Sequence, residues 1–269
     1  MCSLLTAIHI DDPSLCPRTR TVHKLAENVD EAVVVLARGT PASGKTTLAC
    51  LLCSYYRQRN VPSVVISEWQ SNTSGSYMDF LVRCANEAGY NSVTTSNLVD
   101  YDIVFILDET HVKLEDSYWW FYLMKLEIER TPAPRFCIFS SYGSPNARAP
   151  DNFSRGTHLG YIEDRKQVTI SRSLESKYFP FISLFYKRYE FDDVVLRSCT
   201  DVRHPLPLHK ESSDYIYTLT IGHPGAVMAI LDMLRKVSCT VDFCLHSLIA
   251  YGMRCRCTVL RLSMGTLQL

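Results

Sequence analysis

The chain has 269 residues, 46% of them hydrophobic, and its 28 Lys and Arg side chains are balanced by 28 Asp and Glu side chains. This composition fits a globular protein with a substantial core, and the zero net charge predicts no general attraction to nucleic acid or to membrane lipid. The eleven cysteines are odd in number and too dilute for a disulfide scaffold, which favours an intracellular location, cytoplasmic or nuclear.

We expect neither a membrane span nor an export signal in the amino-terminal region. No apolar run reaches the length that crosses a bilayer, and the first residues lack the basic region of a secretory leader. We therefore expect no membrane partner, and the amino terminus does not support secretion. Residues 1–30 mix charged residues with Pro13 and Pro17, which predicts an irregular lead-in with a short helix at 22–29.

Residues 32–55 predict a strand, a loop and a helix in that order. The apolar run 33–36 is typical of a parallel strand buried on both faces, and leucines recur with helical spacing after residue 47. The letters between them, GTPASGKT, fit the phosphate-binding pattern G-x-x-x-x-G-K-[ST] in its required context. The predicted nucleotide-binding residues of this segment are Gly39, Thr40, Pro41, Ala42, Ser43, Gly44, Lys45, Thr46 and Thr47.

These residue types have known uses in binding a triphosphate. Backbone N–H groups can surround a phosphate at a helix start, where the helix dipole adds positive potential. Lys45, which we expect in an exposed loop, would reach the β- and γ-phosphates as a catalytic cation, and the Thr46 hydroxyl would bind Mg²⁺. The guanine-reading pattern N-K-x-D does not occur in the sequence, which favours ATP over GTP.

A second informative stretch, 101–109, is a buried strand that ends in two carboxylates. Ligands of open α/β sheets bind at the carboxyl ends of the strands. Asp108 would hold Mg²⁺, and Glu109 would orient and deprotonate the attacking water. An acidic turn without function is the alternative.

The remaining elements alternate until about residue 175. Strands are expected at 63–67, 135–141 and 166–170, and helices at 77–88 and 115–130. Gly89 is placed to end the first of these helices. At the end of the strand 135–141, Ser140 or Ser141 could sense the γ-phosphate or could cap the next turn.

The later part of the chain reads as helical. Helices are expected at 190–197 and 226–237, the second preceded by Gly222-His223-Pro224-Gly225, a turn that could bring His223 or a backbone N–H to the nucleotide. The tail contains several potential metal ligands without the spacing of a zinc finger, so no zinc site is predicted. These residues are Cys239, Cys244, His246, Cys255 and Cys257.

These segments together resemble the P-loop NTPase module of Crinkler-type proteins of oomycetes and fungi, within the AAA+/STAND group. The matching stretches are RGTPASGKTTL at 38–48, VFILDET at 104–110, FSSYGSP at 139–145, FISLFYKRYEFDDVV at 181–195 and GHPGAV at 222–227. The resemblance implies ATP and Mg²⁺ at Gly39, Lys45 and Thr46, a Walker B pair at Asp108 and Glu109, and a sensor near Ser141. It also implies that His223, Pro224 and Gly225 belong to a lid that folds over the nucleotide.

The sequence therefore predicts an α/β fold, a three-layer P-loop NTPase domain with a parallel sheet at 31–175. A small helical lid at 176–237 and a tail at 238–269 would follow. The predicted function is ATP binding with slow Mg²⁺-dependent hydrolysis that serves as a conformational switch. One alternative is a nucleotide-kinase-like phosphotransferase, kept open by Arg148, Arg155 and Arg165. The other is a non-catalytic, ATP-dependent scaffold whose lid and tail bind a protein partner or a second copy.

Overall fold

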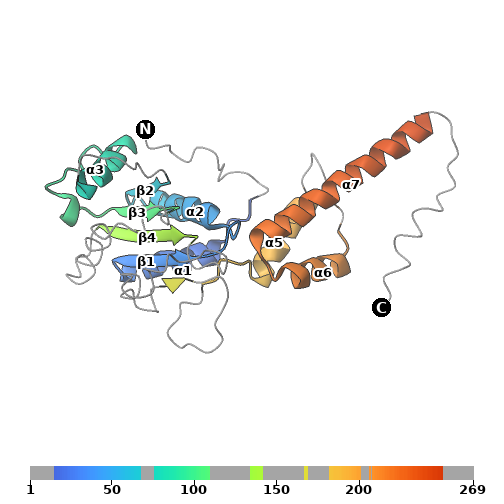
Figure 1. The fold of residues 1–269 in the computed structure, drawn as a ribbon, viewed down its shortest axis with the longest axis horizontal. Coiled ribbons are helices and arrows are strands. Elements are labelled where there is room, and N and C mark those ends of the chain that lie inside the picture. Colours follow the sequence, from blue (N-terminus) through green and yellow to red (C-terminus); the bar gives the residue numbers. More distant parts are fainter. Residues whose placement is uncertain are drawn as a thin grey trace, which may run out of the picture.

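The computed structural model describes residues 15–67, 76–109, 134–141, 167–168, 182–200, 206 and 208–250, and of 167–168 and 238–250 the backbone alone. Within these ranges the chain forms an α/β body and a helical part, which lie side by side along the long axis of the molecule (Figure 1).

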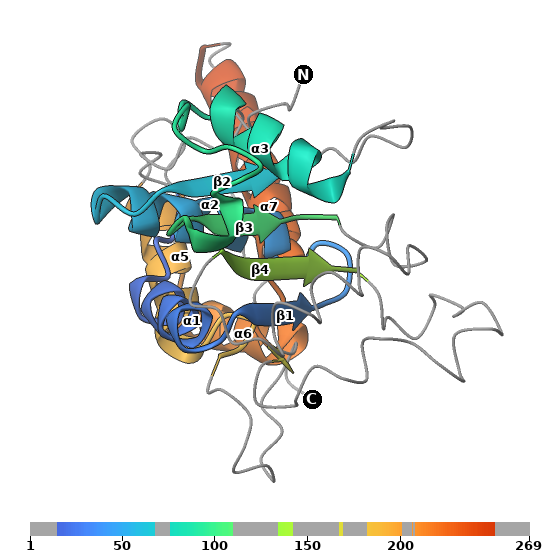
Figure 2. The same cartoon turned by 90° about the vertical axis from the view of Figure 1, so that its left-hand side faces the viewer.

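A five-stranded parallel sheet forms the centre of the body, in the order β2-β3-β4-β1-β5. Its strands are β1 (Val34–Arg38), β2 (Ser63–Ile66), β3 (Val104–Leu107), β4 (Arg135–Ser140) and β5 (Gln167–Val168). The strands point the same way, so their carboxyl ends meet at one edge of the sheet (Figure 2). Because β4 pairs with both β1 and β3, it separates the strand before the phosphate loop from the strand that precedes Asp108.

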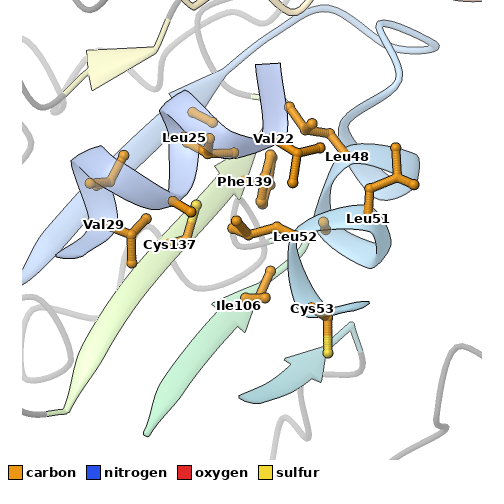
Figure 3. Packing of buried hydrophobic residues seen from close by; sticks show 14 of the residues in the cluster. Val22, Leu25, Val29, Leu48, Leu51, Leu52, Cys53, Ile106, Cys137 and Phe139 are labelled. Atoms are coloured by element: carbon orange, nitrogen blue, oxygen red, sulfur yellow. The ribbon is translucent and has the colours of Figure 1, made fainter. Parts of the chain in front are cut away.

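Three helices cover the two faces of the sheet: α1 (Thr19–Glu31), α2 (Lys45–Gln58) and α3 (Tyr77–Glu87). Successive strand residues alternate between two cores. Leu36 and Ile138 pack in the core under α3, whereas Ile106 and Phe139 pack in the core under α1 and α2 (Figure 3). The continuous apolar runs in the sequence reflect this burial on both faces, and the three-layer α/β prediction is confirmed.

The helix α1 corrects the expected irregular lead-in. Val22, Leu25, Ala26 and Val29 are buried at positions i, i+3, i+4 and i+7, the spacing of one helix face. That face packs against α2 and the sheet. Residues 19–31 are therefore part of the body, and the helix is longer than the 22–29 predicted.

The ends of α3 follow local sequence signals. Ser76 and Asp79 form a capping box, in which each side chain bonds the other residue's backbone N–H. After the helix, Gly89 has φ of +96°, a left-handed conformation that glycine adopts readily, as predicted. A 3₁₀ turn, η1 (Leu98–Asp100), leads into β3. The helix predicted at 115–130 lies outside the described residues.

The helical part consists of α5 (Arg188–Thr200), α6 (Lys210–Thr220) and α7 (Pro224–Ala250). Its core is small and includes Phe191, Ile216, Val227 and Leu231. The helices predicted at 190–197 and 226–237 lie within α5 and α7, whereas α6 was not predicted. α7 continues past residue 237, where the sequence placed the tail, and extends beyond α5 and α6 (Figure 1). Among the described residues, no helix has both the length and the apolar character needed to cross a bilayer.

Candidate functional site

The segment 39–46, here called the phosphate loop, leaves β1 at the carboxyl edge of the sheet and starts α2. The Gly39 N–H donates to Ser140 O at 3.1 Å, which ties the loop to the end of β4. Gly44, with φ of +83°, is the N-cap residue of α2. At Gly39 close packing is what requires glycine, because a Cβ there would lie 2.6 Å from Ser43 Oγ.

Lys45 is the first residue of α2, and its exposed fraction is only 5%. The expectation of an exposed lysine is wrong, because the side chain folds back over the loop. Its Nζ donates to Gly39 O at 3.2 Å and to Thr40 O at 2.8 Å. Burial lowers the pKa of Lys45, and the nearby carboxylates of Glu109 and Asp108 act in the opposite direction. The ammonium is thus held at the loop, in the field of two carboxylates.

Asp108 and Thr46 bring the end of β3 to the start of α2. Thr46 Oγ1 donates to Asp108 Oδ2 at 2.6 Å, and the aspartate is 1% exposed. The other oxygen, Asp108 Oδ1, accepts the N–H of Glu109 at 3.0 Å. Glu109 is partly exposed and has φ of +53°, a region that few residues other than glycine occupy. The backbone turns sharply here, so the two adjacent carboxylates occupy different environments.

Two observations indicate that the residues of this loop suit a phosphate and Mg²⁺. The hydroxyl of Ser43 is fully buried and has no hydrogen-bond partner among the described residues, a rare condition for a buried polar atom. The Thr46 hydroxyl and the Asp108 carboxylate supply oxygen ligands, the type that Mg²⁺ prefers. We therefore regard the residues as suited to both groups. No group of three or more His, Cys, Asp or Glu side chains with metal-binding geometry occurs in the described ranges.

The turn at 222–225, here called the lid turn, contacts the phosphate loop directly. The Gly225 N–H donates to Ala42 O at 2.9 Å. A Cβ at Gly44 would meet Pro224 at 3.4 Å, so the proline lies against the loop where α2 begins. The first residues of α2 and α7 are consequently neighbours, and both helix dipoles add positive potential at this place.

His223 uses its two ring nitrogens for different contacts, one with the first turn of α7 and one with the phosphate loop. Nδ1 accepts the Ala226 N–H at 3.2 Å, so in the neutral ring Nε2 carries the hydrogen. Nε2 lies 3.5 Å from Thr40 Oγ1, and the ring packs edge-on against Phe185 at a centroid distance of 4.9 Å. His223 thus caps α7 and faces the loop at the same time.

The structure brings the loop residues, Asp108, Glu109 and His223 together at one edge of the sheet. Ser140 is buried at the end of β4, and Ser141 follows it, partly exposed; their role as a sensor stays a prediction. Residues 142–166, with Arg148, Arg155 and Arg165, lie outside the described residues, as do the tail cysteines 255 and 257. For Cys239, Cys244 and His246 only the helical backbone is described. The packing of Leu184 against Gly39 was missed, and no local pattern in the sequence signals it.

Comparison with solved structures identifies the class of fold. The chain has the fold of a P-loop ATPase: it matches the Walker-type ATPase PABY2304 of Pyrococcus abyssi with a TM-score of 0.50 at 12% identity, over 88% of this chain and 74% of that one. No protein-family model matches the sequence, and no curated protein does.

Weaker matches are found to two further proteins. The replication initiator DnaA bound to AMPPCP and single-stranded DNA gives a TM-score of 0.45 at 13% identity, over 81% of this chain and 60% of that chain. A point variant of RuvB from Thermotoga maritima gives a TM-score of 0.41 at 16% identity, over 84% of this chain and 64% of that chain.

Proposed function

We propose that the protein binds ATP with Mg²⁺, hydrolyses it slowly and uses the nucleotide as a conformational switch. The observation that carries this proposal is the 2.6 Å contact between Thr46 Oγ1 and Asp108 Oδ2. It joins the end of a glycine-bounded phosphate loop to the carboxylate pair at the end of β3, which is the arrangement that phosphoryl transfer from a nucleoside triphosphate requires.

Each side chain of the site has a distinct task in this proposal. Lys45 would release the carbonyls of Gly39 and Thr40 and turn its ammonium to the β- and γ-phosphates, and loop N–H groups would bind phosphate oxygens. Thr46 and Asp108 would hold Mg²⁺, which supplies neutralisation of phosphate charge when bound.

Glu109 would act as the general base in hydrolysis. It would accept a proton from water as the water oxygen attacks the γ-phosphorus. The bond from that phosphorus to the β,γ-bridging oxygen breaks, and ADP and phosphate leave. The left-handed backbone at Glu109 supports this role, because strained conformations at functional sites persist where surrounding structure holds them.

The switch part of the proposal rests on the lid turn. Gly225 and His223 contact Ala42 and Thr40 of the phosphate loop, so any change of the loop on binding a nucleotide alters what the helical part contacts. A ligand shifts such an equilibrium only through different contacts with the open and closed forms. The likeness of 181–195 and 222–227 to Crinkler-type modules supports a switch of the AAA+/STAND kind.

Two variants of the site test the proposal. Lys45→Ala should lose measurable ATP–Mg²⁺ binding in calorimetry. Glu109→Gln should bind ATP but turn it over about 10²–10⁴-fold more slowly, the usual contribution of a general base. Glu27→Gln is the matched control, since Glu27 is exposed on α1 and pairs there with His23; it should leave both measurements unchanged.

A single-turnover assay with small phosphate acceptors separates the proposal from its two alternatives. Release of inorganic phosphate alone supports an ATPase, and transfer to an acceptor supports a phosphotransferase. ATP binding without any turnover supports a scaffold. Unchanged affinity in a folded Lys45→Ala protein would remove the assignment of the phosphate loop.

A further inference from the structure

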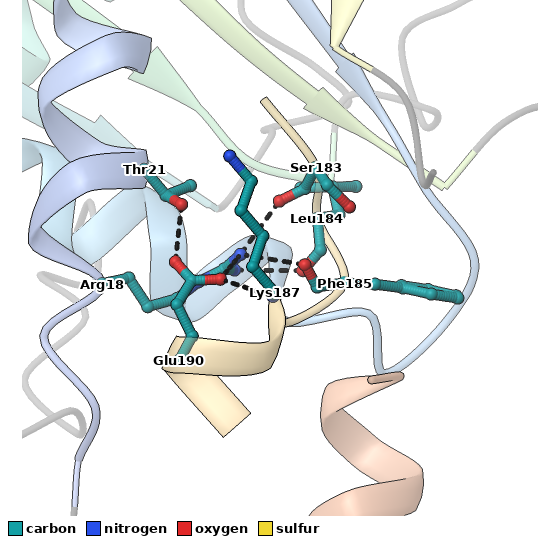
Figure 4. A network of polar contacts seen from close by, with 7 residues as sticks. All are labelled: Arg18, Thr21, Ser183, Leu184, Phe185, Lys187 and Glu190. Carbon is teal, nitrogen blue, oxygen red and sulfur yellow. Dashed lines mark hydrogen bonds and ion pairs between the residues drawn. The ribbon is translucent and has the colours of Figure 1, made fainter. Parts of the chain in front are cut away.

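Arg18, just before α1, is a buried arginine outside the candidate site. It is 4% exposed and has a left-handed backbone, with φ of 45° and ψ of 37°. Its guanidinium donates to three successive carbonyl oxygens, those of Ser183 at 2.9 Å, Leu184 at 3.0 Å and Phe185 at 3.4 Å (Figure 4). One side chain of the body thus holds the backbone that leads into the helical part.

The charge of Arg18 is matched by Glu190, in the first turn of α5. Arg18 Nε lies 3.2 Å from Glu190 Oε1, and both side chains are almost fully buried. Thr21 Oγ1 also donates to Oε1, at 2.5 Å, and the Lys187 N–H donates to Oε2 at 2.9 Å (Figure 4). Elements far apart in the sequence therefore meet in one largely buried polar network.

Residues 183–186, here called the linker, lie between the two functional segments of the site. A Cβ on Gly39 would collide with the Leu184 side chain, so that side chain lies against the phosphate loop. The Phe185 ring packs on His223, and the Tyr186 N–H donates to Gly222 O at 2.8 Å. The linker thus contacts the loop on one side and the lid turn on the other.

We infer that Arg18 and Glu190 are positioning residues, which hold the linker so that the lid turn docks on the phosphate loop and thereby set the affinity for nucleotide. The part that concerns affinity rests on the proposed function. The part that concerns docking does not, because the contacts are present in the protein alone. Arg18 touches no residue of the phosphate loop in any of its described contacts, so its effect on the site would pass through the linker.

Energetic considerations favour a positioning role over simple stabilisation. A buried ion pair adds little net stability, because removing two charges from water costs about as much as their attraction returns. Its geometry is nevertheless specific, since an arginine offers five donors in a fixed fork. The left-handed backbone of Arg18 is unfavourable for a residue with a Cβ. An arginine nevertheless stands where glycine would suit the backbone, which indicates that the contacts of the arginine side chain are needed at this position.

Hydrogen exchange of Arg18→Gly in the absence of nucleotide tests the docking. Glycine suits the left-handed backbone, so this variant removes the side chain without adding strain there. We expect the amides of Tyr186 and Gly225 to exchange at least about fivefold faster, the lower end of typical coupling between sites. Arg188→Ala is the matched control, because Arg188 pairs with Asp192 and Asp214 within the helical part and should leave these amides unchanged.

Two more variants keep the inference testable if Arg18→Gly does not fold. Glu190→Gln retains shape but loses the charge and should accelerate exchange at the same two amides. Arg18→Lys keeps the charge without the fork and should restore protection only in part. Exchange at Tyr186 and Gly225 no faster in these variants than in Arg188→Ala would overturn the inference.

Calorimetry with ATP then links docking to the site. Arg18→Gly should weaken ATP binding by between about five- and 150-fold, the usual range of coupling, while Arg188→Ala binds as the parent does. If the parent itself binds no ATP, the proposed function fails, and the exchange experiment still decides whether Arg18 docks the lid turn. Faster exchange with unchanged ATP affinity would overturn the coupling to affinity.

Discussion

The α/β body and the helical part bury apolar surface to different extents. In the described residues of the body every large apolar side chain is at least partly covered. In the helical part several are exposed: Tyr189, Leu196, Tyr215, Leu219, Ile221, Met233 and Val237. The body has two extensive cores, one on each face of the sheet, whereas the helical part has a single small one. A region with a small core opens at lower free energy, so the helical part is the element better suited to move.

The largest expected effect comes from truncating a core residue in each region. Phe139 is fully buried in the body, and Phe139→Ala should lower the free energy of unfolding by about 3–5 kcal/mol. Leu231→Ala in the helical core should cost about 2 kcal/mol, the lower end for such changes, and should leave body amides protected. Denaturant titration combined with hydrogen exchange measures both. If Leu231→Ala accelerates hydrogen exchange of the body amides as much as Phe139→Ala does, the two regions unfold as one cooperative unit.

An intermediate effect is expected where the regions touch. A Cβ at Gly225 would lie 2.6 Å from Ala42 Cβ and 2.9 Å from Ala42 O, so Gly225→Ala should cost about 1–3 kcal/mol of contact between lid turn and loop. We expect weaker ATP binding in calorimetry. Gly89→Ala is the control, because the left-handed backbone of Gly89 also disfavours alanine but no atom lies within 4 Å of the added Cβ. It should lower the free energy of unfolding and leave ATP affinity unchanged.

A smaller effect is expected from His223→Ala, which removes the cap of α7 and the contact with Thr40. Its cost in stability should be about 1 kcal/mol, the value of one hydrogen bond. In the parent, ATP should protect amides 220–237 from exchange more than ADP does, and the variant should erase that difference. His209→Ala is the control, since His209 stands before α6 without a side-chain cap bond. Equal protection of the parent by ATP and ADP would leave the helical part without a switching role.

The smallest expected effect is a gain in stability rather than a loss. Ile221 is 71% exposed and has φ of +52°, an unfavourable backbone for a β-branched residue. Relief of the left-handed backbone is worth about 1–2 kcal/mol, and the greater freedom of glycine in the unfolded chain offsets about 0.5–1 kcal/mol of it. Ile221→Gly should therefore stabilise the protein by about 0.5–1 kcal/mol, visible as a higher Tm. Unchanged or lower stability would show that the isoleucine has contacts that compensate for its backbone.

Local patterns in the sequence predicted much of the body and its site. Each of these patterns spans only a few residues, so one segment suffices to recognise it. They are the glycine-bounded loop, the apolar runs and the carboxylates at 108 and 109. The left-handed Gly89 was predicted for the same reason, whereas α7 begins at Pro224, two residues before the predicted start at 226.

Other features depend on how the chain folds back on itself, within one loop or between distant segments, and leave no such pattern. The burial of Lys45 depends on how its own loop closes. The role of Arg18 depends on carbonyls at 183–185, which any sequence would provide. The helix α6 was missed because its letters, KESSDYIYTLT, are mostly polar and have only a weak apolar stripe; packing on α5 and α7 decides its conformation.

The position of β4 between β1 and β3 has a consequence for synthesis of the chain. Val34 pairs with Phe136, and Gly39 bonds to Ser140, so β1 has no strand beside it until the ribosome has passed residue 140. At translation rates of about 5–20 residues per second the apolar β1 waits on the order of ten seconds without a partner. During that interval it is a segment that chaperones can bind, and the phosphate loop gains its hydrogen bond from Gly39 to Ser140 only when β4 arrives.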